Sequence, residues 1–151
     1  MENNIPIYSQ DDFKNMHSAG SLAADVLDLL YDFIVPGIST LDINNFCHQI
    51  ITDNNAIPAP LNYKGFPKSV CTSVNHVVCH GIPSEKKILN NGDIINVDVT
   101  VILNGWYGDS SRMFVAGKTN NKNLNLLKVT YECLKIGIDE AKPGNCLGDI
   151  G

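Results

Sequence analysis

Two aspartates, Asp98 and Asp109, lie in the stretch INVDVTVILNGWYGDSS (residues 95–111), which is otherwise typical of β-strands. An ionised carboxylate in a buried strand costs several kcal/mol unless a cation or hydrogen-bond donors meet it. Between the two aspartates, Asn104-Gly105 is the strongest short-range signal for a β-hairpin with a two-residue loop. The chemistry available to this stretch therefore depends on how the hairpin places the two carboxylates.

A two-residue loop fixes which residues of the two strands face one another. Counting outward from the loop, Thr100 faces Asp109 and Asp98 faces Ser111. Because side chains alternate between the two faces, both aspartates project from one face as diagonal neighbours, within about 8 Å at the backbone. Two carboxylates at that distance repel one another, so either one is protonated or a cation lies between them. This geometry favours a metal site.

Ordinary structural roles are the alternative for both aspartates. Asp109 could cap a turn through Gly108 to Ser110, and Asp98 could lie on a solvent-facing strand edge. A three-residue loop or a bulge would put the two carboxylates on opposite faces. Two carboxylates are also too few for a divalent cation, which takes roughly four to six ligands. A metal site here must draw further ligands from elsewhere.

Two histidines, His76 and His80, are the next candidates. Their spacing would suit zinc ligands on a helix, but the intervening Val77-Val78-Cys79 predicts a strand, which argues against that arrangement. His76 is more typical of a solvated turn. His80 stands where a strand runs into the loop Gly81-Ile82-Pro83, a common position for a functional side chain, although a purely structural histidine is the alternative.

The pattern of apolar residues predicts the elements that position these side chains. We expect three helices: one from the cap Ser9 to Pro36-Gly37, one from Ser39 or Thr40 to Asn54-Asn55, and one through Leu124 to Ile138 that stops at Pro143-Gly144. We expect strands at Val70–Val74, Val77–Cys79, Ile94–Leu103 and Trp106–Val115. The proline-rich stretch Ile57–Lys68 is predicted to be irregular.

A short sequence echo suggests an internal repeat. The passage PGISTLDI at 36–43 recurs as PGNCLGDI at 143–150, each time directly after a long amphipathic helix. A chance match is the alternative, since the echo is only eight residues long. If the repeat is real, a second unit begins at the third helix.

Composition narrows the class of protein. The chain has 151 residues, a length typical of one domain. Its composition, 44% hydrophobic and 18% charged, is typical of soluble globular proteins. The net charge is −5 and no basic cluster exceeds Lys86-Lys87, so a nucleic-acid patch is not expected. The sequence shows neither a signal peptide nor a membrane-length apolar run. Five scattered cysteines are typical of reduced thiols, which predicts a cytoplasmic protein.

Four segments together resemble the type I (bacterial-type) methionine aminopeptidases, over their N-terminal half. These segments are NYKGFPKSVC (62–71), NHVVCHGIP (75–83), GDIINVDVT (92–100) and GWYGDSS (105–111). The resemblance implies an α+β protein with the pita-bread fold, in which two similar halves surround a dinuclear site. It also implies two divalent metal ions, of cobalt, manganese, iron or zinc.

The resemblance assigns roles to individual residues. Asp98 would chelate one ion, and Asp109 would bridge both and help to stabilise a metal-bound hydroxide. His80 would be the catalytic residue that hydrogen-bonds the substrate and steadies the tetrahedral intermediate. Tyr63, Phe66 and Cys71 would line the pocket for the methionine side chain. Thr100 would orient Asp109.

Two pocket positions depart from the family pattern. Pro60 stands where a small residue is often found, and Lys64 stands where some relatives carry histidine. The family's other ligands, a histidine and two glutamates, belong to its C-terminal half. We therefore expect residues 1–151 to be a single pita-bread catalytic domain that is truncated at its C-terminus, the N-terminal half plus the first helix of the second.

The function that this resemblance implies is metal-dependent removal of N-terminal methionine from nascent polypeptides. The ribosome would be a candidate site of action, and the full-length protein would be a monomer without membrane or nucleic-acid partners. A proline-directed aminopeptidase of the same fold is one alternative. An inactive pita-bread fragment or binding module is the other.

Overall fold

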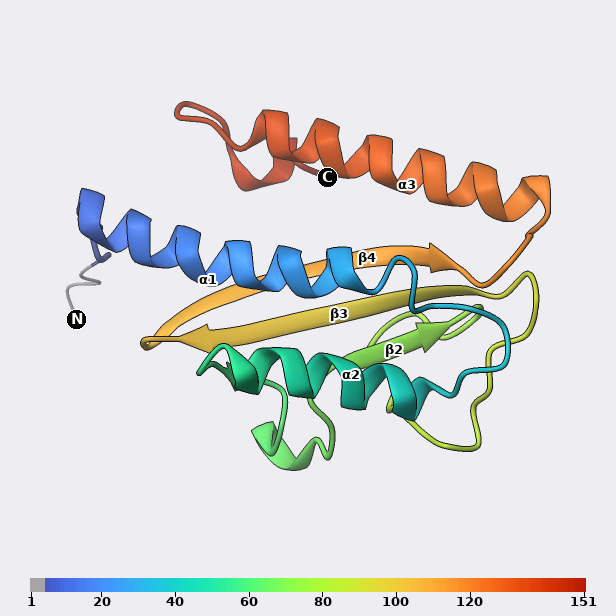
Figure 1. Ribbon diagram of the computed structural model, residues 1–151. Coiled ribbons are helices and arrows are strands. Elements are labelled where there is room, and N and C mark those ends of the chain that lie inside the picture. The colour runs from blue at the N-terminus through green and yellow to red at the C-terminus, as the bar shows by residue number, and fades with distance from the viewer. Residues whose placement is uncertain (1–4) are drawn as a thin grey trace.

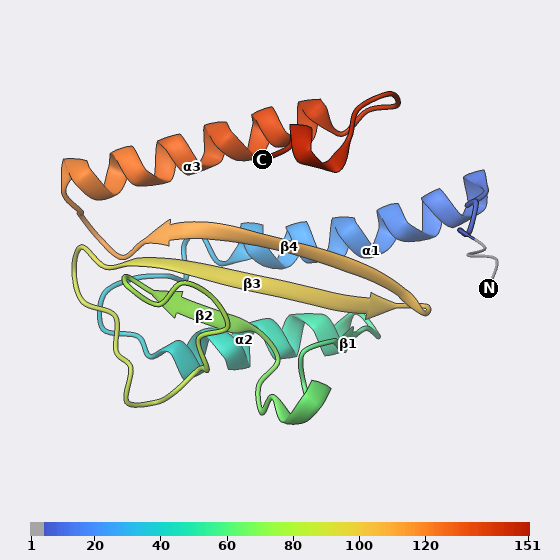
Figure 2. The same ribbon diagram turned by 180° about the vertical axis from the view of Figure 1, so that it is seen from behind.

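The computed structural model describes residues 5–151, which form an antiparallel sheet covered on one face by two helices. The chain runs through α1 (Gln10–Leu29), α2 (Thr40–Asp53), β1 (Ile57–Pro58), β2 (Cys71–Val74), β3 (Ile94–Leu103), β4 (Trp106–Val115) and α3 (Asn121–Glu140). β3 is central: β4 pairs along one side of it, and β1 and β2 pair with it on the other. Figures 1 and 2, which view the sheet from opposite sides, show α1 and α2 on the same face.

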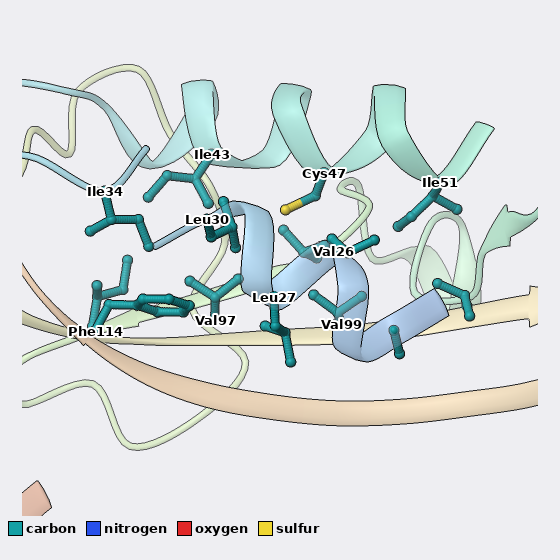
Figure 3. Packing of buried hydrophobic residues seen from close by; sticks show 14 of the residues in the cluster. Val26, Leu27, Leu30, Ile34, Ile43, Cys47, Ile51, Val97, Val99 and Phe114 are labelled. Carbon is teal, nitrogen blue, oxygen red and sulfur yellow. The ribbon is translucent and has the colours of Figure 1, made fainter. Parts of the chain in front are cut away.

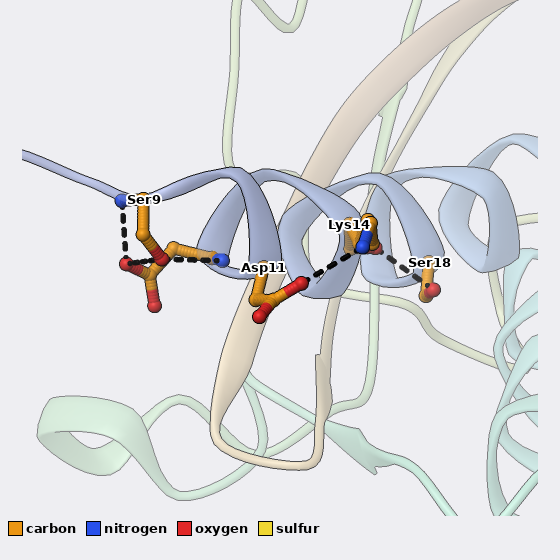
Figure 4. Close-up of polar contacts among 5 residues, drawn as sticks. Ser9, Asp11, Lys14 and Ser18 are labelled. Carbon is orange, nitrogen blue, oxygen red and sulfur yellow. Dashed lines mark hydrogen bonds and ion pairs between the residues drawn. The ribbon is translucent and has the colours of Figure 1, made fainter.

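Serine caps begin both covering helices. At α1, Asp12 N–H donates to Ser9 Oγ (3.3 Å) and Ser9 N–H donates to the Asp12 carboxylate (2.8 Å), as Figure 4 shows. At α2, Ser39 and Asp42 form the same reciprocal pair. The hydrogen bonds that Ser9 and Ser39 donate hold the pKa of the Asp12 and Asp42 carboxyls below its usual value. The predicted caps are confirmed, and Ser39 rather than Thr40 is the second one.

The core lies between the helices and β3. Val97, Val99 and Val101 are fully buried on the face that meets the helices. They pack in one cluster with Val26 and Leu27 of α1, with Leu30 directly after it, and with Ile43, Cys47 and Ile51 of α2, most of them visible in Figure 3. Burial raises the pKa of the Cys47 thiol to about 12, so it behaves as an apolar side chain. The alternate residues of β3, among them Asp98, face away from this core.

The hairpin between β3 and β4 has the predicted two-residue loop. Asn104 and Gly105 both adopt positive φ (52° and 84°), as the turn that matches the twist of a hairpin requires. Thr100 pairs with Asp109 and Asp98 pairs with Ser111, which confirms the predicted register. The two carboxylates therefore share the face that α1 and α2 leave uncovered.

One predicted strand and one predicted irregular stretch need correction. Val77–Cys79 is not a strand, because Asn75 adopts a left-handed conformation (φ 53°) that turns the chain out of the sheet directly after β2. The stretch Ile57–Lys68 is irregular as predicted, except that Ile57–Pro58 pairs with β3 and Tyr63–Gly65 forms a short 3-10 helix. A proline is tolerated there because β1 lies at an edge, where one strand side needs no backbone donor.

α3 stands apart from the rest of the molecule. None of its residues is buried, and it packs substantially against no other described element. The motif that follows α3 repeats the one that follows α1: Gly37 and Gly144 have φ of 99° and 98°, and Cys146 N–H donates to the Asp149 carboxylate as Ser39 N–H donates to that of Asp42. The sequence echo therefore has a structural counterpart. Within residues 5–151, no helix is both long and apolar enough to cross a bilayer.

The buried hydroxyl of Thr72 is expected to lower the stability of the fold. The Thr72 side chain is 4% exposed on the core side of β2, opposite Val97, and its hydroxyl has no hydrogen-bond partner among the described residues. Thr72→Val should stabilise the full-length protein by about 1 kcal/mol in chemical denaturation, because the unpaired hydroxyl is removed at nearly constant volume. Ser73→Ala is the matched control and should destabilise, since the Ser73 hydroxyl accepts from Gly81 N–H (3.2 Å). A loss of stability in Thr72→Val would contradict this account.

Candidate metal centre and substrate cavity

Asp98 and Asp109 are held by different contacts on the uncovered face of the hairpin. The hydroxyl of Thr100 donates to Asp109 Oδ1 (2.9 Å), directly across the β3–β4 ladder. Asp98 is half-buried and receives no hydrogen bond from the described residues. Burial raises the pKa of the Asp98 carboxyl, the charge of Asp109 raises it further, and His80 opposes the shift. A cation between the two carboxylates would offset both the cost of burying Asp98 and its repulsion by Asp109.

The donor set fits part of a divalent metal site. Carboxylate oxygens are suitable ligands for divalent metals such as manganese and iron, and Oδ2 of Asp109 is not taken by the Thr100 bond. Within residues 5–151, however, no three histidine, cysteine, aspartate or glutamate side chains lie close enough to hold an ion together. Asp98 and Asp109 could therefore supply two ligands, and a complete site needs others.

His80 is placed by a loop that folds back onto β2. Thr72 N–H donates to the carbonyl of Gly81 (2.8 Å), which ties the loop to the strand. A Cβ at Gly81 would overlap the carbonyl oxygen of Thr72, so only glycine allows this close approach. His80 itself adopts a positive φ of 55°, which is uncommon for a non-glycine residue and clusters at functional sites. His76 lies on the exposed outer turn of the same loop and does not line the cavity.

A cavity of about 870 Å³ opens beside the two aspartates. All six residues predicted to form the site line it: Tyr63, Phe66, Cys71, His80, Asp98 and Asp109. The other lining residues are Ala59, Pro60, Lys64, Gly65, Pro67, Ile82, Thr100 and Tyr107. Ile82 and Tyr107 were not predicted to belong to the site. The alternation of side chains along the strand puts Tyr107 on the same face as the aspartates, so its place in the site could have been predicted. The place of Ile82 depends on the path of the loop, which the sequence does not predict.

Cys71 joins the pocket to the aspartates. It pairs with Asp98 in the β2–β3 ladder, so the two side chains share a face. Burial raises the pKa of the Cys71 thiol to about 11, and the nearby Asp98, Cys79 and Asp109 contribute to the rise. The thiol is therefore neutral near pH 7, which suits an apolar wall and not a nucleophile.

Comparison with known proteins identifies the family. Residues 14–151 match metallopeptidase family M24. The chain belongs to this family. It is 56% identical to methionine aminopeptidase of Rickettsia prowazekii (strain Madrid E), over 97% of this chain and 56% of the relative. It is 44% identical to methionine aminopeptidase of Escherichia coli (strain K12), again over 97% of this chain and 56% of the relative.

Solved structures confirm the fold. The crystal structure of methionine aminopeptidase from Rickettsia prowazekii matches with a TM-score of 0.94 at 56% identity, over 97% of this chain and 58% of that chain. Prolidase from Pyrococcus furiosus matches with a TM-score of 0.79 at 19% identity, over 95% of this chain and 41% of that one, and shows the fold alone. The predicted α+β pita-bread fold is confirmed. The chain spans a little over half the length of its methionine aminopeptidase relatives, and membership of a metallopeptidase family implies a divalent metal cofactor.

Proposed function

We propose that the full-length protein is a metal-dependent aminopeptidase that removes N-terminal methionine from nascent polypeptides. The observation that carries the proposal is that one cavity is lined by two neighbouring carboxylates, a histidine, two aromatic rings and a thiol. The identity of 44–56% to relatives named methionine aminopeptidase supports the same substrate.

Asp98 and Asp109 would hold the metal. Asp98 and Asp109 would both be ligands in this site, which would hold two divalent ions of cobalt, manganese, iron or zinc. Bound there, the ions would polarise the scissile carbonyl and acidify a water molecule. Thr100 keeps Asp109 in one orientation through the 2.9 Å bond to Oδ1, which leaves Oδ2 for ligation. The remaining ligands must come from residues other than these.

His80 would act on the substrate. His80 lines the cavity and lies close enough to Asp98 to lower the pKa of that carboxyl, so its imidazole would be beside a scissile amide bound at the metal. A hydrogen bond from this imidazole would stabilise the negative charge that develops on the tetrahedral intermediate. The positive φ of His80 and the tight contact of Gly81 with β2 fix the backbone that carries this side chain.

The pocket wall suits a methionine side chain. Methionine is unbranched and polarisable, and it makes favourable contacts with aromatic rings and sulfur. Tyr63 and Phe66 supply aromatic surface, and the neutral thiol of Cys71 supplies a polarisable floor. Pro60 and Lys64, the two departures from the family pattern, line the same cavity and would tune selectivity.

Release of the first residue from short peptides by the full-length protein, loaded with manganese, tests the substrate. We expect Met-Ala-Ser to be cleaved with a kcat/KM at least about tenfold above that of Leu-Ala-Ser, since a shaped apolar pocket discriminates by this order. A proline-directed enzyme of the same fold would instead prefer Ala-Pro-Ser. Preference for that peptide would overturn the proposal. Cytoplasmic location, a monomeric state and action at the ribosome stay predictions.

A non-catalytic binding module is the second candidate. It would have no use for two carboxylates that repel one another and raise the pKa of Asp98. Metal uptake by the full-length protein without release of methionine would favour the module over the enzyme.

A further inference from the structure

One wall of the cavity is a loop with few attachments. Residues 59–68, here called the pocket loop, carry Tyr63 and Phe66. At its start, Ala59 N–H donates to the carbonyl of Thr100 (2.9 Å). Every other backbone hydrogen bond that the pocket loop makes in the described structure stays within residues 58–66, and its side chains make none.

The pocket loop also contains strained backbone. Asn62 and Lys64 have positive φ (67° and 48°), a conformation that side chains other than glycine adopt at some cost. Such a conformation persists only where the flanking structure holds it. The shape of the wall therefore depends on how firmly its two ends are anchored.

The second anchor is Ser69, directly after the pocket loop. Its backbone N–H donates to Asn44 Oδ1 (2.8 Å), and a hydrogen bond of 2.8 Å joins its hydroxyl to His48 Nδ1. Ser69 is 2% exposed, so water cannot replace these two bonds as partners of its buried N–H and hydroxyl groups. Asn44 and His48 lie one turn apart on α2 and thus project from the same side of that helix.

We propose that Asn44 and His48 are positioning residues for the substrate cavity. By holding Ser69 they fix the C-terminal end of the pocket loop and the start of β2, and so set how the pocket loop and Cys71 close around the substrate side chain. Neither residue lines the cavity, so the effect passes through Ser69. The substrate part of this inference rests on the proposed aminopeptidase function.

His48→Ala in the full-length, manganese-loaded protein tests the inference through kinetics. We expect KM for Met-Ala-Ser to rise about fivefold, the equivalent of one hydrogen bond, with kcat changed less than about twofold. His48→Asn keeps a polar group near the place of Nδ1 and should restore most of the KM. Gln49→Ala is the matched control and should behave as wild type, because Gln49 is an exposed neighbour on α2 whose side chain bonds only to Asp53 among the described residues.

A second readout requires no catalysis. Cys71 and the exposed Cys79 can be labelled with iodoacetamide and separated by peptide mass spectrometry. We expect His48→Ala to speed the labelling of Cys71 severalfold relative to Cys79, and His48→Asn and Gln49→Ala to leave that ratio near wild type. Faster Cys71 labelling in a protein that releases no methionine would support the positioning role while the proposed function fails.

Two results would overturn the positioning role. One is an unchanged KM together with an unchanged labelling ratio in His48→Ala. The other is a loss of folded protein in His48→Ala that His48→Asn does not reverse, since that pattern belongs to a purely structural residue.

Discussion

Asp109→Asn in the full-length protein is expected to lower kcat/KM for Met-Ala-Ser by about a thousandfold or more. The asparagine side chain has nearly the same shape and can still accept the hydrogen bond from Thr100, so the hairpin should keep its structure. It lacks the negative charge needed to hold two cations, which is the contribution that metal catalysis depends on. The measurement is methionine release at saturating manganese, beside the metal content of the purified variant.

Asp25→Asn is the matched control for this substitution. Asp25 is exposed on α1, which covers the opposite face of the sheet from the two aspartates, so this variant should keep wild-type activity. Activity of Asp109→Asn within about threefold of wild type would remove Asp109 from the metal site. A fall in activity with full metal content would assign it another role.

Gly108→Ala is expected to have the largest effect on stability. Gly108 lies on β4 beside α1, and a Cβ there would overlap the backbone carbonyl of Ala19 and approach the nitrogen of Gly20 to 2.6 Å. A helix backbone cannot rotate away as a flexible side chain can, so α1 would have to move off the sheet. We expect a loss of about 3 kcal/mol, at the upper end for overpacking, measured by urea denaturation of the full-length protein.

Gly20→Ala provides a control of opposite sign at the same helix–sheet contact. A Cβ at Gly20 meets nothing within 4 Å, and the residue lies in the interior of α1. Alanine should therefore stabilise the helix by roughly 0.5–1 kcal/mol. A loss of less than about 1 kcal/mol in the free energy of unfolding of Gly108→Ala would contradict the close packing of α1 against β4.

The parts of this molecule that sequence predicts well are governed by local chemistry. Asn104-Gly105 dictates a two-residue hairpin, and the hairpin alone sets the register that brings Asp98 and Asp109 to one face. Ser9 and Ser39 mark helix starts because their hydroxyls can accept a backbone N–H that the helix leaves unpaired. These features need no knowledge of distant contacts.

The parts that sequence missed depend on contacts between distant segments. Val77–Cys79 has strand-forming residues, but the left-handed Asn75 directs them away from the sheet. Ser69 looks like any polar residue in a loop until its two partners on α2 are seen. Tyr63 and Phe66 were assigned to the pocket by resemblance, because nothing in the local sequence fixes the path of the pocket loop.

Metal reconstitution of the full-length protein tests the central claim most directly. The protein would be stripped of metal by a chelator, dialysed and titrated with manganese while bound metal and methionine release from Met-Ala-Ser are followed together. If Asp98 and Asp109 belong to a metal centre that carries out the reaction, the stripped protein releases no methionine and activity returns in step with bound metal. Undiminished release by the fully stripped protein would contradict the account.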